Sequence, residues 1–179
     1  MLKHFRLLSL LFCLALTACV TTAPKSANYS QLQASFADSA WNGATIPSGE
    51  VCNKFNSRPG NAPSIKVSNI PNTTVRLELK FSDETARAAF RNGGHGIISY
   101  TLPTAGMSEV VIPSFPGQVS NLPPNFQIVR NFTSEAWDSG TGYLPPCSGG
   151  KGNLYTVVIS GFDAQGSLTG EVKLKMGRY

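Results

Sequence analysis

Three stretches of the chain carry residues that could bind or polarise a small ligand. Asp83 ends a segment of alternating apolar and charged residues, His95 stands between glycines in Gly93–Tyr100, and Gly142–Tyr155 combines a Pro-Pro-Cys corner with a glycine-rich turn. A histidine and the backbone N–H groups that glycines expose can together bind an oxyanion, and a carboxylate can orient the imidazole. The alternative is purely structural, because a histidine beside glycines is often a loop residue and an Asp after Ser often caps a helix.

The sequence lacks the common enzyme and metal motifs. It has no Gly-x-Ser-x-Gly nucleophile elbow, no Gly-x-Gly-x-x-Gly after a strand, no Cys-x-x-Cys and no His-Glu-x-x-His. Gly149–Gly152 is similar to part of a phosphate loop, but a Walker A motif needs Gly where Pro145 stands and Ser or Thr where Gly152 stands. These patterns predict a protein that holds no metal and no cofactor and that is not an enzyme.

Strands must position the three stretches. Val75–Phe81 and Glu171–Met176 alternate between apolar and charged residues, as strands with one buried face do. Asp163–Gly166 lies between two such runs and predicts a hairpin loop, whereas residues 82–91, with arginines near the end and a Gly-Gly pair after them, predict a short helix. Further strands are expected at Ile65–Ile70, Ile97–Leu102, Val110–Ile112 and Leu154–Ile159. A chain rich in Gly and Pro with short apolar runs is typical of a mainly β protein.

The first residues predict export and lipid attachment. A positively charged start, an apolar run at Leu7–Leu16 that is shorter than the roughly 20 residues of a bilayer span, and small residues that end on Cys19 resemble a bacterial lipoprotein signal. In such signals residues 1–18 are removed and acyl chains such as palmitate anchor the cysteine, each buried CH₂ contributing about 0.8 kcal/mol. Residues 19–35 are then expected to be a flexible tether and residues 36–179 the domain. The alternative is an ordinary signal peptide in which the cysteine is incidental.

The residue after the lipid site predicts the membrane in which the protein is anchored, and the net charge of the mature chain bears on its possible partners. Val20 is not Asp, which in many Gram-negative bacteria favours the outer membrane, with the domain in the periplasm. Thirteen of the fifteen Lys and Arg and all ten acidic residues follow Cys19, so the mature net charge is near +3. No basic stripe of the kind that binds nucleic acid is present, and no nucleic-acid partner is predicted.

The cysteine count predicts one disulfide. If Cys13 leaves with the signal and Cys19 carries lipid, Cys52 and Cys147 remain as one pair in an oxidising compartment. A bond between them would close a loop of about 95 residues and contribute on the order of 3–4 kcal/mol. The alternative is two separate buried thiols.

Several motifs occur in the order found in one known family. Phe81–Ala86 stands where that family has an Asp-rich motif at a strand end, Gly94–Gly96 where it has a histidine motif that enters a strand, and Gly142–Cys147 and Gly152–Tyr155 where it has Gly-x-x-Pro-Cys and Gly-x-His-x-Tyr. Earlier correspondences are Ile46-Pro47, Cys52, Asn61–Ile65 and Ser68–Pro71. Over residues 36–179 the chain thus resembles the phosphatidylethanolamine-binding protein family, in its bacterial branch. It departs where glycines replace the tryptophans beside His95 and where Asn153 replaces the second pocket histidine.

The resemblance implies a mainly β (α+β) domain, an antiparallel β-sandwich with a few peripheral short helices. It also implies a membrane-tethered binding protein for a small anion or a phosphorylated headgroup such as that of a phospholipid. Strand ends and loops would form the pocket, and both Cys52 and Cys147 match positions near it. The ligand-binding residues that the resemblance implies are Asp83, His95, Pro146, Asn153 and Tyr155.

Two other functions stay open at this point. Some relatives bind kinases or proteases, which implies an interaction protein acting through the pocket rim and the proline-rich segment 103–124, expected to be a long loop. A protein partner would then replace the small ligand. The remaining catalytic possibility is a triad of Asp83 and His95 with Ser99 or Ser148, since triads are defined in space and not in sequence.

Overall fold

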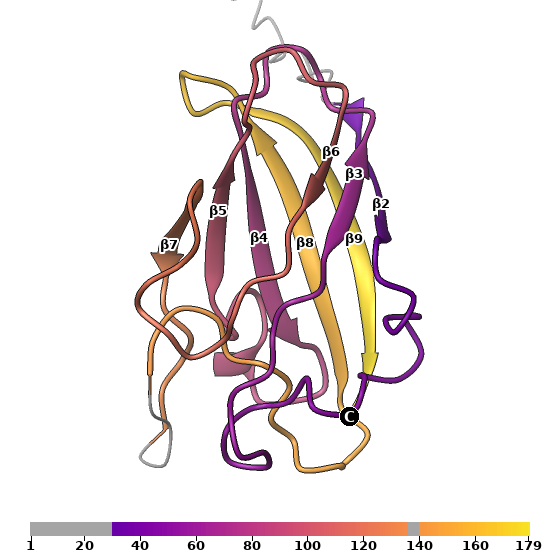
Figure 1. The fold of residues 1–179 in the computed structure, drawn as a ribbon, viewed down its shortest axis with the longest axis vertical. Coiled ribbons are helices and arrows are strands. Elements are labelled where there is room, and N and C mark those ends of the chain that lie inside the picture. The colour runs from indigo at the N-terminus through magenta and orange to yellow at the C-terminus, as the bar shows by residue number, and fades with distance from the viewer. Residues whose placement is uncertain (1–29, 136–139) are drawn as a thin grey trace, which may run out of the picture.

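The structure, a computed structural model, describes residues 30–135 and 140–179; the expected signal peptide, Cys19 and the first part of the expected tether lie outside these residues. The described chain forms nine strands in two sheets (Figure 1). The larger sheet has the order β1-β9-β8-β4-β5-β7, with bounds Ser30–Gln31, Leu168–Arg178, Leu154–Phe162, Arg76–Asp83, Ile97–Thr101 and Phe126–Arg130. The smaller sheet has the order β2-β3-β6, with bounds Gln33–Phe36, Ile65–Ser68 and Glu109–Ile112. Among the described residues, no helix is long and apolar enough to cross a bilayer.

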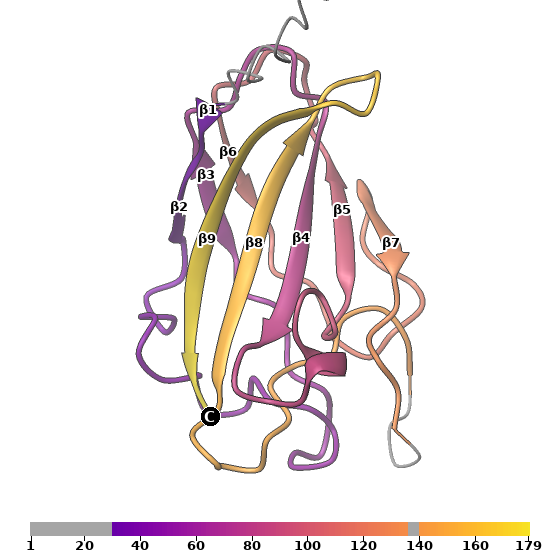
Figure 2. The same ribbon diagram turned by 180° about the vertical axis from the view of Figure 1, so that it is seen from behind.

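The two sheets share one hydrophobic core. The smaller sheet covers one face of the larger, as the opposite views of Figures 1 and 2 show. Strand β4 supplies Leu77, Leu79 and Phe81 to this core, and its alternating pattern turns Glu78 and Lys80 to the other face. Each fully buried apolar side chain contributes about 1.5–3 kcal/mol. From the smaller sheet the core receives Ile65, Val67, Val110 and Ile112.

The expected strands are confirmed, several with longer bounds. Val75–Phe81 becomes β4, Glu171–Met176 becomes part of β9, and Leu154–Ile159 becomes part of β8. Strands β4 and β8 pair antiparallel, with Leu79 opposite Ile159 and Asp83 opposite Tyr155. The mainly β class is therefore confirmed. The larger sheet is mixed and not wholly antiparallel, because β1 pairs in parallel with β9.

The helix expected at residues 82–91 is wrong. Asp83 is the last residue of β4, and its Oδ1 accepts the N–H groups of Thr85 and Ala86 and so closes a turn. Arg87 and Arg91 have extended backbone conformations, so only a three-residue 3₁₀ turn at Ala88–Phe90 forms between them. The few peripheral helices implied by the resemblance reduce to this turn within the described residues.

Three strands were not expected from the sequence. β1 and β2 lie within or beside the stretch predicted as tether, and Leu32 between them is almost fully buried. Both strands are short and mostly exposed, so their residues alternate too weakly to indicate a strand. Strand β7 follows the segment 103–124 and forms one edge of the larger sheet. That segment is not all loop, since it contains β6, as the short apolar run predicted.

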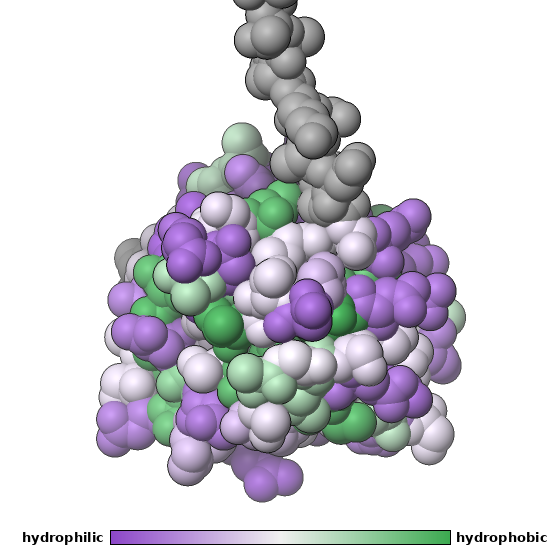
Figure 3. Space-filling model, turned by 90° about the horizontal axis from the view of Figure 1, so that it is seen from above, coloured by the Kyte–Doolittle hydropathy of each residue, from purple (hydrophilic) through white to green (hydrophobic). Residues whose placement is uncertain are grey.

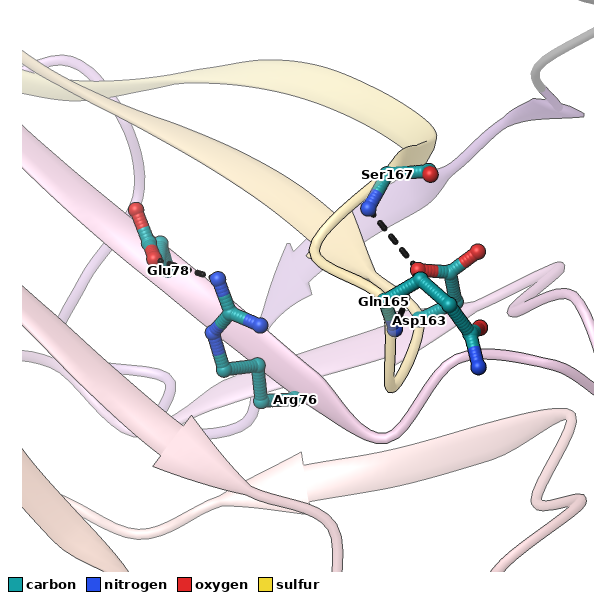
Figure 4. A network of polar contacts seen from close by, with 5 residues as sticks. All are labelled: Arg76, Glu78, Asp163, Gln165 and Ser167. Atoms are coloured by element: carbon teal, nitrogen blue, oxygen red, sulfur yellow. Dashed lines mark hydrogen bonds and ion pairs between the residues drawn. The ribbon is translucent and has the colours of Figure 1, made fainter.

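The hairpin loop expected at Asp163–Gly166 is confirmed and joins β8 to β9. Asp163 Oδ1 accepts the N–H groups of Gln165, at 3.0 Å, and Ser167, at 2.8 Å, which fixes the turn (Figure 4). On β4, Arg76 bonds Glu78 at 3.2 Å and stacks on the Phe162 ring at 4.6 Å. Seen from above, this end shows many hydrophilic residues and small, separate hydrophobic patches (Figure 3).

Candidate functional site

The three chemistry-bearing stretches meet at the opposite end of the sheets. β4 ends there at Asp83 and β8 begins there at Leu154, near the C-terminus marked in Figure 1. The turn that carries His95 leads into β5 beside the end of β4, since the His95 N–H donates to the carbonyl of Phe81 at 3.1 Å. The Leu144 N–H then donates to the carbonyl of His95 at 3.0 Å and brings in the third stretch.

These segments enclose a pocket of about 410 Å³. Asp83, His95, Asn153 and Tyr155, all expected from the sequence, line it together. Pro146 is not among the lining residues; it is buried in the corner behind them, and its carbonyl accepts the Cys52 N–H at 3.1 Å. The rest of the lining is Lys54, Phe55, Ala86, Phe90, Glu135, Leu144, Cys147, Ser148, Gly149 and Lys151.

Asp83 is a buried carboxylate held by uncharged donors. Only 3% of the surface of this residue is exposed. Oδ1 accepts the two turn N–H groups at 2.9 Å, and Oδ2 accepts Asn153 Nδ2 at 2.7 Å. Within residues 30–135 and 140–179 no Lys or Arg forms an ion pair with it. The buried inner end of the pocket, where Asp83 and His95 lie and which we call its floor, therefore carries a negative charge. Hydrogen bonds stabilise this charge, and no Lys or Arg of the described chain neutralises it.

His95 has a defined tautomer. Its ring lies between Phe90 and Tyr155, with centroid distances of 5.8 and 5.3 Å. Nδ1 lies 2.9 Å from the carbonyl oxygen of Leu144. A carbonyl only accepts, so Nδ1 carries the proton and Nε2 of the neutral ring is an acceptor. Burial lowers the pKa of His95 below 6.5, and the Leu144 carbonyl and the Asp83 charge oppose that shift.

Tyr155 and the disulfide connect the floor of the pocket to its solvent-exposed opening, which we call the mouth. The predicted Cys52–Cys147 bond is confirmed, with Cα atoms 5.2 Å apart. The Cys147 N–H donates to the Tyr155 hydroxyl at 3.1 Å. Burial raises the pKa of Tyr155 well above its ordinary value, and Asp83 adds to the shift. The phenol therefore stays protonated at physiological pH.

The glycine-rich turn forms one side of the mouth. Gly149, Gly150 and Gly152 have φ values of +69°, +77° and +78°, a region that side chains disfavour. A Cβ on Gly149 would also lie 2.7 Å from the Phe55 ring. In the described part of the chain, the backbone N–H groups of Gly149, Gly150 and Lys151 form no hydrogen bond. The turn thus presents donors to solvent beside an exposed lysine.

Sequence reasoning missed the other side of the mouth. Lys54 and Phe55 are exposed and line the pocket, and the Phe55 ring packs edge-on against Tyr179 at 6.3 Å. A signal for them existed, because the predicted disulfide of Cys52 places the next residues beside the Pro-Pro-Cys corner. Glu135 also lines the pocket and pairs with Arg87.

The serines considered for a triad are placed differently. Ser99 lies in the middle of β5, opposite Glu78, and does not line the pocket. Ser148 does line it, but its hydroxyl donates to the carbonyl of Tyr179. No cluster of three His, Cys, Asp or Glu side chains that could hold a metal occurs among the described residues.

Comparison with protein-family models, curated proteins and solved structures found no match.

Burial of His95 makes the stability of the fold depend on pH. Because its folded pKa is below the unfolded value of 6.5, the unfolded chain binds more protons and the free energy of unfolding falls as pH drops below 6.5. The slope from this one group cannot exceed about 1.4 kcal/mol per pH unit. We expect His95→Asn, whose amide keeps a donor for Leu144, to lose this component of the slope in urea unfolding. An unchanged slope in the variant would contradict this assignment.

Proposed function

We propose that this chain is a binding protein that holds a small phosphorylated ligand, such as a headgroup, in the 410 Å³ pocket and catalyses no reaction on it. The observation that carries the proposal is the convergence of three distant segments on one polar hollow. A pocket with a few convergent polar groups is the usual form of a small-molecule site. The hydrogen bonds of Ser148 and His95 run to backbone carbonyls and not to each other, which supports binding over nucleophilic catalysis.

The anionic group of the ligand would bind at the mouth. Lys151 is exposed there, and the neighbouring N–H groups of Gly149 and Gly150 point to no partner in the described chain. Successive backbone N–H groups in turns with positive φ form concave anion sites. A lysine ammonium adds a positive charge that strengthens each hydrogen bond to phosphate oxygens.

The fold proposal follows from the same features. The two sheets over one core, the pocket at strand ends, and the disulfide beside it support a sandwich of the phosphatidylethanolamine-binding protein type. The larger sheet differs from a wholly antiparallel sandwich because β1 pairs in parallel with β9. The Asn153 amide bonds Asp83 at the position where the family has a second histidine, so it supports the floor and brings no charge.

We also propose that the domain is tethered to a membrane through lipid on Cys19, in the cell envelope. The first described strand, β1, lies at the end of the sheets opposite the pocket (Figure 2). A tether that enters at that end leaves the pocket mouth open to solvent. The ligand would therefore reach the pocket without passing the anchor.

Titration of the full chain with inorganic phosphate tests the binding proposal. We expect saturable binding by calorimetry that weakens roughly tenfold in Lys151→Ala, since a hydrogen bond to a charged group contributes about 1.5–3 kcal/mol before solvent screening reduces it. Lys66→Ala is the matched control, because it removes the same charge from the smaller sheet, where Lys66 pairs with Glu109. Absence of phosphate binding, or equal weakening by both variants, would contradict the proposal.

A further inference from the structure

The outer face of the larger sheet, which the smaller sheet does not cover, carries an uneven charge (Figure 2). Strand pairing places Lys80 of β4, Val158 of β8 and Lys173 of β9 side by side on this face, because directly paired residues of neighbouring strands share a face. We call the half of this face nearest the pocket the basic face. Six of the twelve Lys and Arg of the described chain lie on it or beside it, namely Lys80, Arg91, Arg130, Lys173, Lys175 and Arg178.

Acidic residues do not balance these charges. The carboxylate in contact with the basic face is that of Glu84, which pairs with Lys173 at 2.6 Å. Within residues 30–135 and 140–179, Lys80 and Lys175 form no ion pair. The acidic residues of β4 and β9 that share the outer face lie in the half nearer the hairpin, at Glu78 and Glu171. The half nearest the pocket therefore has a positive surplus.

Two of the cations share one spot. A Cβ on Gly93 would lie 2.4 Å from Arg130 Nη2 and 2.8 Å from Lys80 Cγ, so both side chains pass over this glycine. The Arg130 guanidinium donates to the carbonyl of Asn92 at 2.7 Å, and this acceptor carries no charge. Like charges that are held close together repel, and a nearby anion relieves the repulsion. An anionic partner that covers this spot therefore gains from both charges.

The cations are spread over a surface and do not surround one point. Across the sheet from β7 to β9, strand pairing sets five residues in one row, Arg130, Ile97, Lys80, Val158 and Lys173. Neighbouring strands are about 4.8 Å apart, which separates successive cations of this row by about 10 Å. Lysine stems pack along aliphatic side chains while their ammonium groups reach outward. Such an array fits an extended anionic surface better than a single small anion.

We propose that the basic face docks on an anionic lipid surface, so that the larger sheet lies against the membrane. The choice of a membrane over another polyanion rests on the proposed lipid anchor. Ten residues separate Cys19 from Ser30, and they can span at most about 36 Å, which is about the length of the 11-residue strand β9. The chain enters the larger sheet at β1, beside β9. A short tether at this edge holds the basic face near the bilayer at high effective concentration.

Vesicle binding by the full chain tests this proposal. The variant Cys19→Ala, which cannot take lipid, is sedimented with vesicles of phosphatidylcholine alone or of phosphatidylcholine mixed with phosphatidylglycerol. We expect at least tenfold tighter binding to the anionic vesicles, since each Lys or Arg near such a surface strengthens binding about fivefold. Added salt should reduce this preference, because it screens the attraction between exposed charges.

Two double variants of this chain locate the contact. Lys80→Gln with Lys175→Gln removes two charges that form no ion pair in the described chain, and should lower the preference for anionic vesicles at least tenfold. Arg58→Gln with Lys66→Gln is the matched control, since it removes the same charge from outside the larger sheet. The control should keep nearly all of the preference. Residues 1–18 are the same in every chain compared.

The possible outcomes separate this inference from the proposed function. Equal binding to both kinds of vesicle, or equal losses in the two double variants, would overturn the basic face as a membrane contact. Binding of polyglutamate through Lys80 and Lys175, without a preference for anionic vesicles, would overturn it in favour of an acidic protein partner. Neither lysine lines the pocket, so their replacement should leave phosphate binding unchanged. Failure of the wild-type chain to bind phosphate would overturn the pocket and leave the basic face. The comparison of vesicles remains decisive if a double variant does not fold.

Discussion

Replacing Gly96 with alanine should lower the free energy of unfolding by about 3–5 kcal/mol. Gly96 has a φ of +103°, which side chains rarely adopt, and a Cβ there would lie 2.4 Å from the carbonyl oxygen of Gly142. That oxygen is fixed, since it accepts the Phe132 N–H at 3.1 Å. The clash must therefore move backbone on one side, and the neighbour that moves with it is His95. Urea unfolding of the variant measures the loss.

Gly106→Ala is the matched control for this prediction. Gly106 has a φ of +76°, and a Cβ there would meet nothing within 4 Å. Its substitution should cost only the strain of a left-handed alanine, about 1–2 kcal/mol. If the two variants lose equal stability, the close approach of Gly96 to Gly142 does not hold the histidine turn in place.

Removing the disulfide should lower the free energy of unfolding by about 3–4 kcal/mol. The Cys52–Cys147 bond closes a loop of 95 residues between the mouth of the pocket and its Pro-Pro-Cys corner. The double variant Cys52→Ala with Cys147→Ala removes the bond without leaving a thiol. We expect a lower midpoint in denaturant for this variant and a weaker affinity for phosphate, because Lys54 and Phe55 lose their tie to the corner.

Reduction of the wild-type chain provides the control for the double variant. Reductant should lower the denaturation midpoint of the wild-type chain toward that of the variant and leave the variant unchanged. A double variant as stable as the oxidised chain would show that the backbone bond from Cys52 to Pro146 suffices to hold the corner.

The alternation of apolar and charged residues predicted the strands that bury only one of their two faces. β4 and β9 were recognisable because each charged residue between two apolar ones faces away from the core. The disulfide followed from cysteine number and compartment. Four of the five expected ligand residues line one pocket because the pairing of β4 with β8 brings Asp83 opposite Tyr155.

Contacts between residues far apart in the sequence determine the features of the fold that sequence patterns did not predict. The segment after Asp83 has helical composition, but its carboxylate closes a turn with Thr85 and Ala86 and the helix does not start. β1 and β2 are polar edge strands that form through pairing with β9 and β3 and not through a pattern of their own. The tautomer of His95 depends on a carbonyl 49 residues away in sequence, which no local pattern reveals.

The state of the His95 imidazole tests the central claim most directly. The nitrogen NMR spectrum of isotopically labelled chain reports which ring nitrogen carries the proton, and the chain has two histidines, so the spectrum of His95→Asn identifies the signal. The structure predicts a protonated Nδ1 and a bare Nε2 near neutral pH, with the Nε2 resonance shifting when inorganic phosphate binds in the pocket that His95 lines. A proton on Nε2, or an Nε2 signal that the ligand leaves unmoved, would contradict the account.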